Sequence, residues 1–104
     1  IKELYFGLGG YNEAMLGIHF IFSFGGQEVS DTKGGWDFYR IKHSEYANWT
    51  EEDRQNDYHE TMIFISKLLK QCNVTDVNDL KNKPVEVEIL DNTLKSWRIL
   101  TEVL

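Results

Sequence analysis

The chain has 104 residues, the length of one small domain, and we expect a single domain over residues 1–104. Hydrophobic residues make up 41% and aromatic residues 13% of the sequence, which is enough for a globular core and argues against wholesale disorder. Seventeen acidic and eleven basic residues give a formal charge of −6, which disfavours binding to duplex DNA or long RNA, although one Arg in a pocket can still attract a small anion.

Three strands are predicted in the first part of the chain. In residues 2–8, the apolar residues Leu4, Phe6 and Leu8 occupy every second position, as in a strand with one buried face. Residues 15–24 are almost continuously apolar and rich in β-formers, which indicates a central strand covered on both sides. Gly25-Gly26 is a hairpin signal, so residues 27–31 are predicted to return antiparallel to that strand.

A long helix is predicted over about residues 51–72. Thr50 suits the N-cap and Asp53 completes a pattern similar to a capping box, while Asn73 is expected to end the helix. Six residues at helical spacing are expected to form one apolar stripe against the sheet: Tyr58, Met62, Ile65, Leu68, Leu69 and Cys72. Ile63 falls on nearly the opposite face, and this additional apolar surface favours self-association.

The last part of the chain predicts a short helical turn over residues 77–80 and a C-terminal β-hairpin. Residues 85–89 alternate between apolar and acidic side chains, Asp91-Asn92 can make the turn, and residues 93–103 supply the second strand. One helix followed by a hairpin does not generate repeated βαβ crossovers. We therefore expect an α+β fold with an antiparallel sheet of about five strands, one long helix and a C-terminal hairpin.

No sequence motif frames a catalytic or metal site. Cys72 is the only Cys, so no intramolecular disulfide can form, and a buried thiol is expected. His19, His43 and His59 are too dispersed for a zinc motif, and His19 is expected to be a satisfied core or interface residue. We expect no enzyme activity, no cofactor and no metal. The sequence has no secretory leader and no apolar run that could span a membrane, which predicts a soluble intracellular protein without a membrane partner.

Residues 34–49 form the segment best suited to a ligand. The segment contains five aromatic rings together with Arg40, Lys42 and His43, and it lacks the periodicity of a helix or strand. Two interpretations remain open, since such a loop can be a satellite core tucked over the sheet or one wall of a pocket. Trp36, Phe38 and Arg40 are the ligand-binding candidates of this segment.

Three further ligand-binding candidates lie in the C-terminal hairpin: Asn92, Trp97 and Arg98. Asn92 can read an adenine edge, although turns also favour Asn for backbone reasons. Trp97 offers an aromatic face. Arg98 shares its strand face with Leu and Ser residues and needs an anionic partner, which is either a carboxylate of the same fold or an anionic group of a ligand.

Two segments carry a family resemblance: FGLGGYNEAMLGIHF at residues 6–20 and KPVEVEILDNTLKSWRILTEVL at residues 83–104, with GGWDF at residues 34–38 between them. They resemble small bacteriophage and prophage proteins of the Thoeris anti-defence family, the signal-sequestering sponges. The resemblance implies capture of glycocyclic ADP-ribose, the messenger made by bacterial TIR-domain enzymes. It also implies dimers that can build hexamers and, for some members, a separate site for cyclic oligonucleotides.

We therefore expect a phage-encoded protein, in the cytoplasm of an infected bacterium, that binds and sequesters a cyclic nucleotide signal without cleaving it. One alternative is a protein-binding inhibitor whose acidic residues 51–60 occupy a basic site on a host enzyme. A second alternative is a small enzyme that degrades a nucleotide signal.

Overall fold

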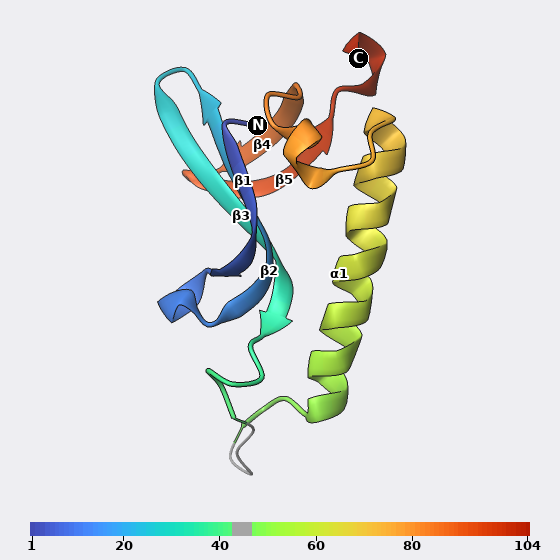
Figure 1. Ribbon diagram of the computed structural model, residues 1–104. Helices are drawn as coiled ribbons and strands as arrows, with labels where there is room; N and C mark the ends of the chain where they lie inside the picture. The colour runs from blue at the N-terminus through green and yellow to red at the C-terminus, as the bar shows by residue number, and fades with distance from the viewer. Residues whose placement is uncertain (43–46) are drawn as a thin grey trace.

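The computed structural model of the chain describes residues 1–42 and 47–104. Strands β1 (Glu3–Gly9), β2 (Met15–Phe24) and β3 (Gln27–Trp36) form a three-stranded antiparallel sheet in that order. Helix α1 (Glu51–Cys72) runs along this sheet, and a separate antiparallel hairpin of β4 (Val85–Leu90) and β5 (Thr93–Ile99) crosses it at the end near the N-terminus (Figure 1). The α+β class and the C-terminal hairpin are confirmed.

The five strands form two sheets and not the single sheet that we predicted. The reason is the way in which the hairpin meets the first sheet. The ring of Trp97 packs on Phe20 and Phe22, with centroid distances of 4.9 and 4.8 Å, so β5 contacts the face of the sheet through side chains. The hairpin is thus held by aromatic packing, which the local sequence pattern does not reveal.

Strand β3 continues to Trp36, beyond the predicted end at residue 31. The glycines that suggested an exit from the sheet are required by close packing within it. Gly34 lies opposite Gly17 in the ladder, and a Cβ atom at Gly34 would come within 2.3 Å of the Leu16 carbonyl oxygen. A Cβ atom at Gly35 would meet Tyr58 of α1 at 3.0 Å, so helix and strand approach closely there as well.

The hairpin turn is confirmed, whereas the predicted length of its second strand is wrong. Asp91 and Asn92 have φ of 52° and 63°, the left-handed conformation that two-residue hairpin turns need. Strand β5 ends at Ile99, and Thr101–Val103 form a 3-10 turn. The Leu100 N–H donates to the Pro84 carbonyl at 3.0 Å, and Pro84 has no N–H with which to continue the ladder.

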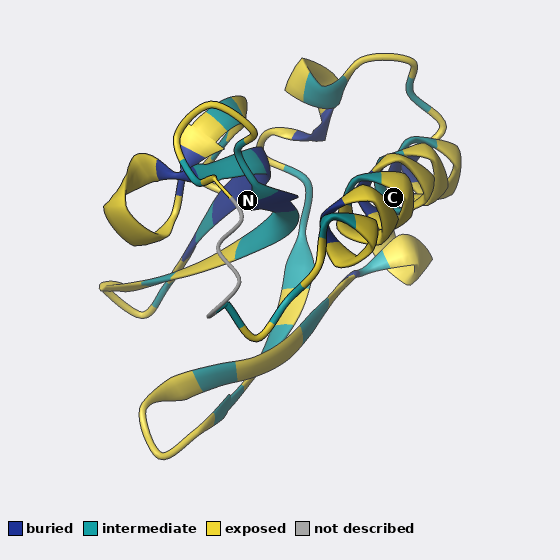
Figure 2. Cartoon of the chain, turned by 90° about the horizontal axis from the view of Figure 1, so that it is seen from below, coloured by how far each residue is buried: buried dark blue, intermediate teal, exposed yellow. Residues whose placement is uncertain are grey.

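The core lies between β2, α1 and the hairpin, while the outer side of α1 is exposed (Figure 2). Its buried apolar residues come from β2, α1, the short helical turn Val77–Leu80 and β5: Ile18, Phe20, Phe22, Leu68, Cys72, Leu80 and Ile99. Burial raises the pKa of the Cys72 thiol above its ordinary value, in part offset by Lys83. The predicted buried thiol is confirmed.

The predicted bounds of α1 and its capping box are confirmed, but its apolar stripe differs from the prediction at one position. The Thr50 hydroxyl accepts from the Asp53 N–H and the Asp53 carboxylate accepts from the Thr50 N–H. The buried face is centred on four residues, Arg54, Thr61, Leu68 and Cys72. Met62 follows Thr61 and is therefore turned about 100° away from this line. Its side chain is 54% exposed, against our prediction.

Candidate functional site

The chain that follows β3 folds into a tight turn on Asp37. The Asp37 carboxylate accepts hydrogen bonds from the N–H groups of Tyr39 at 3.2 Å and Arg40 at 3.0 Å, and its carbonyl accepts from the Ile41 N–H at 2.9 Å. The Asp37 N–H donates to the Ala14 carbonyl at 2.7 Å, which ties the turn to the start of β2. This turn holds Phe38 and Tyr39 at the surface, where both rings are exposed.

Arg54 fixes this turn against the first turn of α1. Its side chain is only 2% exposed, and Nη2 donates to the Ile41 carbonyl at 2.5 Å and lies 3.4 Å from Glu51 Oε1. The guanidinium carbon lies 4.7 Å from the ring centroid of Trp49 and 5.6 Å from that of Phe38. Nε has no hydrogen-bond partner among the described residues. A buried cation in contact with two rings is thus left with one unused donor.

Five residues of the turn and of α1 line a cleft of about 430 Å3: Phe38, Tyr39, Lys42, Glu51 and Arg54. This volume falls within the range of small-molecule sites, about 300–1,000 Å3. The lining combines two aromatic faces, two cations and one carboxylate at the positive end of the α1 dipole. Such a set can stack on a planar ring, pair with an anionic group and accept a hydrogen bond from a hydroxyl.

Tyr58 ties α1 to the end of β3. Its hydroxyl donates to the Trp36 carbonyl at 2.5 Å. Burial raises the pKa of Tyr58 above its ordinary value, and the nearby Arg54 cation opposes that rise. The backbone of Trp36 is therefore anchored from the helix side, directly before the turn that carries Phe38.

The structure places one of the six predicted ligand-binding residues, Phe38, in the cleft. Trp36 is half-buried at the end of β3 and Arg40 is exposed, and neither belongs to the lining of the cleft. His43 and Tyr46, which belong to the predicted aromatic segment, lie outside the described residues.

The three predicted ligand-binding residues of the hairpin have other surroundings. Asn92 is an exposed turn residue. Trp97 is half-buried on β2 and donates from Nε1 to Asp31 Oδ2 at 2.8 Å. Arg98 lies 3.0 Å from Glu102 and 3.4 Å from Glu86, so its partners are carboxylates of the same fold, one of the two alternatives left open by the sequence. The six residues are not gathered into one pocket.

The ion pairs of Arg98 with Glu86 and Glu102 at the surface shift the pKa values of Arg98 and Glu102. Hydrogen bonds to Glu102 and Glu86 raise the pKa of Arg98, and the hydrogen bond from Arg98 lowers the pKa of Glu102. The Arg98 side chain is about half exposed, and screening by solvent keeps such pairs weak. Arg98 is thus already neutralised within the chain.

Arg54 is the functional candidate that sequence reasoning missed. The sequence did contain a signal for its burial. Stepping back by seven residues from Leu68, a member of the predicted apolar stripe, gives Thr61 and then Arg54, and all three are buried. A charged side chain that continues an apolar stripe needs partners from another segment, which here is the turn after β3.

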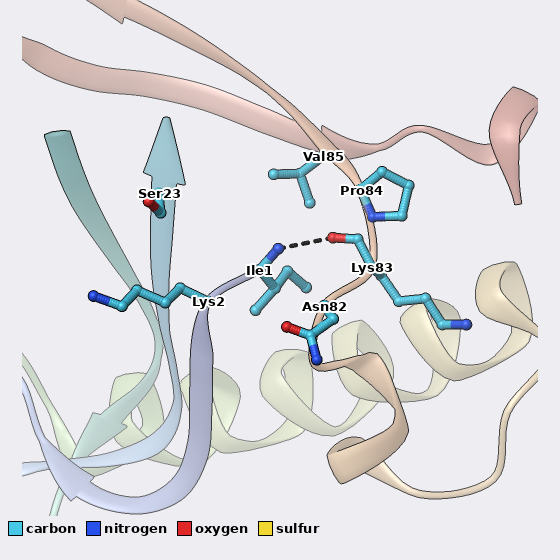
Figure 3. A pocket seen from close by; sticks show the side chains of 7 residues that line it. All are labelled: Ile1, Lys2, Ser23, Asn82, Lys83, Pro84 and Val85. Carbon is cyan, nitrogen blue, oxygen red and sulfur yellow. Dashed lines mark hydrogen bonds between the residues drawn. The ribbon is translucent and has the colours of Figure 1, made fainter. Parts of the chain in front are cut away.

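A second cavity, of about 450 Å3, lies between the N-terminus and the start of β4 (Figure 3). The Ile1 amine donates to the Lys83 carbonyl at 2.7 Å. The side chains of Lys2 and Lys83 extend away from one another in Figure 3, and Lys2 pairs with Glu28 at 3.0 Å. The polar groups of this cavity therefore do not converge on one point, as a specific ligand would require.

His19 is buried and both of its ring nitrogens have partners, as predicted for a satisfied core residue. Nε2 lies 2.9 Å from the Gly7 carbonyl and Nδ1 lies 2.9 Å from the Thr32 hydroxyl. A carbonyl can only accept, so Nε2 donates to Gly7. Within residues 1–42 and 47–104, no group of three or more His, Cys, Asp or Glu side chains is arranged to hold a metal ion.

Neither α1 nor any other helix of the described residues is long and apolar enough to cross a membrane. Comparisons with protein-family models, curated proteins and solved structures find no match to this chain. The resemblance to the sponge family therefore stays a prediction.

Proposed function

We propose that the protein binds a small cyclic nucleotide in the cleft beside Arg54 and sequesters it without cleavage, in the cytoplasm of an infected bacterium. The observation that carries this proposal is the buried Arg54 guanidinium, which contacts two aromatic rings in the wall of a cleft of about 430 Å3. The sequence resemblance to the sponge family supplies the ligand's identity, glycocyclic ADP-ribose.

Each chemical part of such a ligand has a matching group in the cleft. An adenine ring can stack on Phe38 or Tyr39, both of which are exposed. A pyrophosphate can pair with Lys42, while the buried Arg54 guanidinium supplies positive charge to the wall of the cleft. Ribose hydroxyls can donate to the Glu51 carboxylate. This division of roles explains why two cations and one carboxylate would share one small cleft.

The cleft is largely preorganised. The hydrogen bonds of the Asp37 carboxylate fix the turn that carries Phe38, and the bond from Arg54 to Ile41 fixes the guanidinium against it. A ligand would therefore pay little conformational entropy at these residues, which favours tight binding. Tight binding without turnover is what sequestration requires.

The acidic alternative has no specific observation in its favour. Three of the acidic side chains in residues 51–60 already have partners within the chain: Asp53 caps α1 at Thr50, Glu51 pairs with Arg54, and Glu60 lies 3.6 Å from Lys33. An acidic surface that mimics nucleic acid would need these carboxylates to be available to a partner.

Titration calorimetry with purified cyclic ADP-ribose isomers tests the proposal. We expect saturable heat with one of them and a rise in Tm in its presence. No heat and no shift in Tm at concentrations well above micromolar would reject it. Mass spectrometry of the ligand released by heat denaturation separates a sponge, which returns the ligand intact, from an enzyme, which returns products.

A further inference from the structure

Strand β1 forms one edge of the three-stranded sheet, and beyond Glu3 at its start it carries none of the usual protection against pairing with another strand. Its residues 4–9 contain no charged side chain and no Pro, and its register with β2 runs without a bulge. The opposite edge, β3, carries Glu28, Asp31 and Lys33. Proteins commonly use charges, Pro or bulges to keep edge strands apart, so an uncharged, regular edge indicates a pairing site.

The side chains of β1 are also incompletely covered on both faces of the sheet. Phe6 is 46% exposed and Leu8 37% exposed on the face that carries α1, and Tyr5 is 48% exposed on the other face. Helix α1 packs against β3 and β2, through the contacts of Tyr58 with Gly35 and of Phe64 with Phe20. The turn Val77–Leu80 contacts β1 and Leu4 packs on the core, so the open part of that face lies at Phe6 and Leu8. Apolar side chains therefore accompany the free backbone edge.

We propose that two copies of this chain pair antiparallel through β1, which joins their sheets into one of six strands. An edge that meets its own copy across a two-fold axis is self-complementary, because each strand offers the same donors and acceptors to the other. Every second residue of an edge strand directs its N–H and C=O outward, so outward residues must face outward residues. One residue must therefore lie directly opposite its own copy. A two-fold axis between two residues would instead place outward residues opposite inward ones.

The geometry selects Phe6 as that residue. Strand β1 spans Glu3–Gly9, and centring on Phe6 overlaps all seven of its residues with those of the copy. A pairing centred on Tyr5 would include Ile1, but the backbone of Ile1 already forms hydrogen bonds with Asn82 and Lys83. Centring on Gly7 would use Gly10, whose φ of 68° lies outside the strand region.

The pairs created by this register are chemically compatible. On the face that carries α1, Phe6 meets Phe6 of the copy and Leu4 meets Leu8, so apolar side chains cover each other. On the other face, Tyr5 meets Gly7, a residue without a side chain, and each Tyr5 ring leans along its own strand over Gly7 and Gly9. Glu3 meets Gly9, so no like charges lie opposite one another.

Light scattering after size-exclusion chromatography tests the pairing. We expect a mass of twice the 12.2 kDa of one chain, reduced to one chain in Phe6→Lys and in Leu8→Lys because Lys blocks an edge. Met62→Lys, at another exposed apolar position, is the matched control and should leave the dimer intact. Circular dichroism of each variant verifies its fold. A wild-type protein that remains a monomer at high concentration would overturn the proposal. The β1 edge would then be available to a strand of another protein.

Disulfide trapping tests the register without relying on destabilising changes. The Cα atoms of opposed residues lie about 4.5–5.5 Å apart, within the span of a disulfide, so Phe6→Cys should cross-link to its copy on oxidation. Leu8→Cys is displaced from its copy by about 13 Å and should cross-link only when mixed with Leu4→Cys. Cross-linking of Leu8→Cys alone, or a dimer in which Phe6→Cys gives no disulfide, would refute this register.

Discussion

The indole Nε1 of Trp97 donates to Asp31 Oδ2 at 2.8 Å and so joins β5 to β3, two strands of different sheets. The same ring packs on Phe20 and Phe22. One side chain thus combines aromatic packing with a directional bond that fixes the orientation of the hairpin on the first sheet.

Replacing Trp97 should therefore separate the hairpin from the sheet. We expect Trp97→Ala to lower the free energy of unfolding by about 3 kcal/mol, since it removes a ring from an aromatic cluster. Asp31→Ala should cost about 1 kcal/mol, because it leaves the Trp97 ring in place and removes the hydrogen bond from Trp97 together with an exposed one from the Thr32 N–H. Urea denaturation followed by fluorescence or circular dichroism measures both. Lys95→Ala, on the exposed face of β5, is the control, and a Trp97→Ala variant as stable as this control would contradict the role assigned to Trp97.

The cleft should be sensitive to Lys42 and Phe38. We expect Lys42→Ala and Phe38→Ala each to weaken nucleotide binding about tenfold, because one removes a charge-assisted contact and the other a stacking face. Both side chains lie at the surface, so the Tm without ligand should stay within the range of ordinary surface substitutions. Calorimetry and thermal scans provide the two measurements.

Arg40→Ala and Tyr11→Ala are the matched controls for the cleft. Each removes an exposed side chain of the same chemical kind that does not line the cleft, so each should bind as the wild type does. Equal losses in Lys42→Ala and Arg40→Ala would point to a diffuse charge effect. Loss of the fold in Phe38→Ala would instead support the interpretation of this segment as a satellite core.

The bond from Tyr58 to the Trp36 carbonyl should contribute to stability in a pH-dependent way. Tyr58→Phe should cost about 1 kcal/mol at neutral pH, the net contribution of one hydrogen bond. The folded state raises the pKa of Tyr58 above the ordinary value of 10.0, so it favours the protonated phenol. The contribution is therefore complete below pH 10 and is lost as the pH rises through the folded pKa.

Urea denaturation of wild type and Tyr58→Phe at neutral and alkaline pH checks this sign. The difference in free energy of unfolding between the two proteins should shrink as the pH rises above about 10. The comparison isolates Tyr58, because the other tyrosines are common to both proteins. A difference that grows with pH would show that the anionic form of Tyr58 is the one stabilised by the fold.

Cys72 should resist modification as long as the chain is folded. Its thiol is buried against the core and its pKa is raised by burial, so little reactive thiolate is present at neutral pH. We expect reaction with a disulfide reagent to be at least about 100-fold slower in buffer than in denaturant. Equal rates under the two conditions would show that the C-terminal end of α1 opens readily.

The elements that the sequence predicted well are those whose signals are local. The capping box of Thr50 and Asp53 marks the start of α1, and the glycine pair after β2 marks a hairpin, because both features depend on neighbouring residues. The division into two sheets depends on Trp97 meeting β2, a contact between residues far apart in the chain. No local pattern encodes it.

The candidate site was only partly predictable for a similar reason. Phe38 stands out in the sequence as part of an aromatic segment, and its place in the cleft follows from that segment. Arg54 belongs to a helix whose charged residues usually face solvent, so its burial is explained only by the contacts that it makes with Trp49 and Ile41. Trp97 and Arg98 were predicted to bind a ligand because one is an aromatic ring and the other a cation. In the structure, Trp97 bonds to Asp31 and Arg98 pairs with Glu102, so both side chains have partners within the fold.

The Gly17 and Gly34 pair also limits how this sheet can change during evolution. A Cβ atom at either position would come closer than 2.5 Å to a carbonyl oxygen of the neighbouring strand, at 2.2 Å for Gly17 and 2.3 Å for Gly34. Neither position is a turn, so the restriction comes from the adjacent backbone and would not be relieved by residues that tolerate unusual φ. Both strands would have to move apart to admit even Ala, and a mutational scan should find these two mid-strand positions among the least variable of the chain.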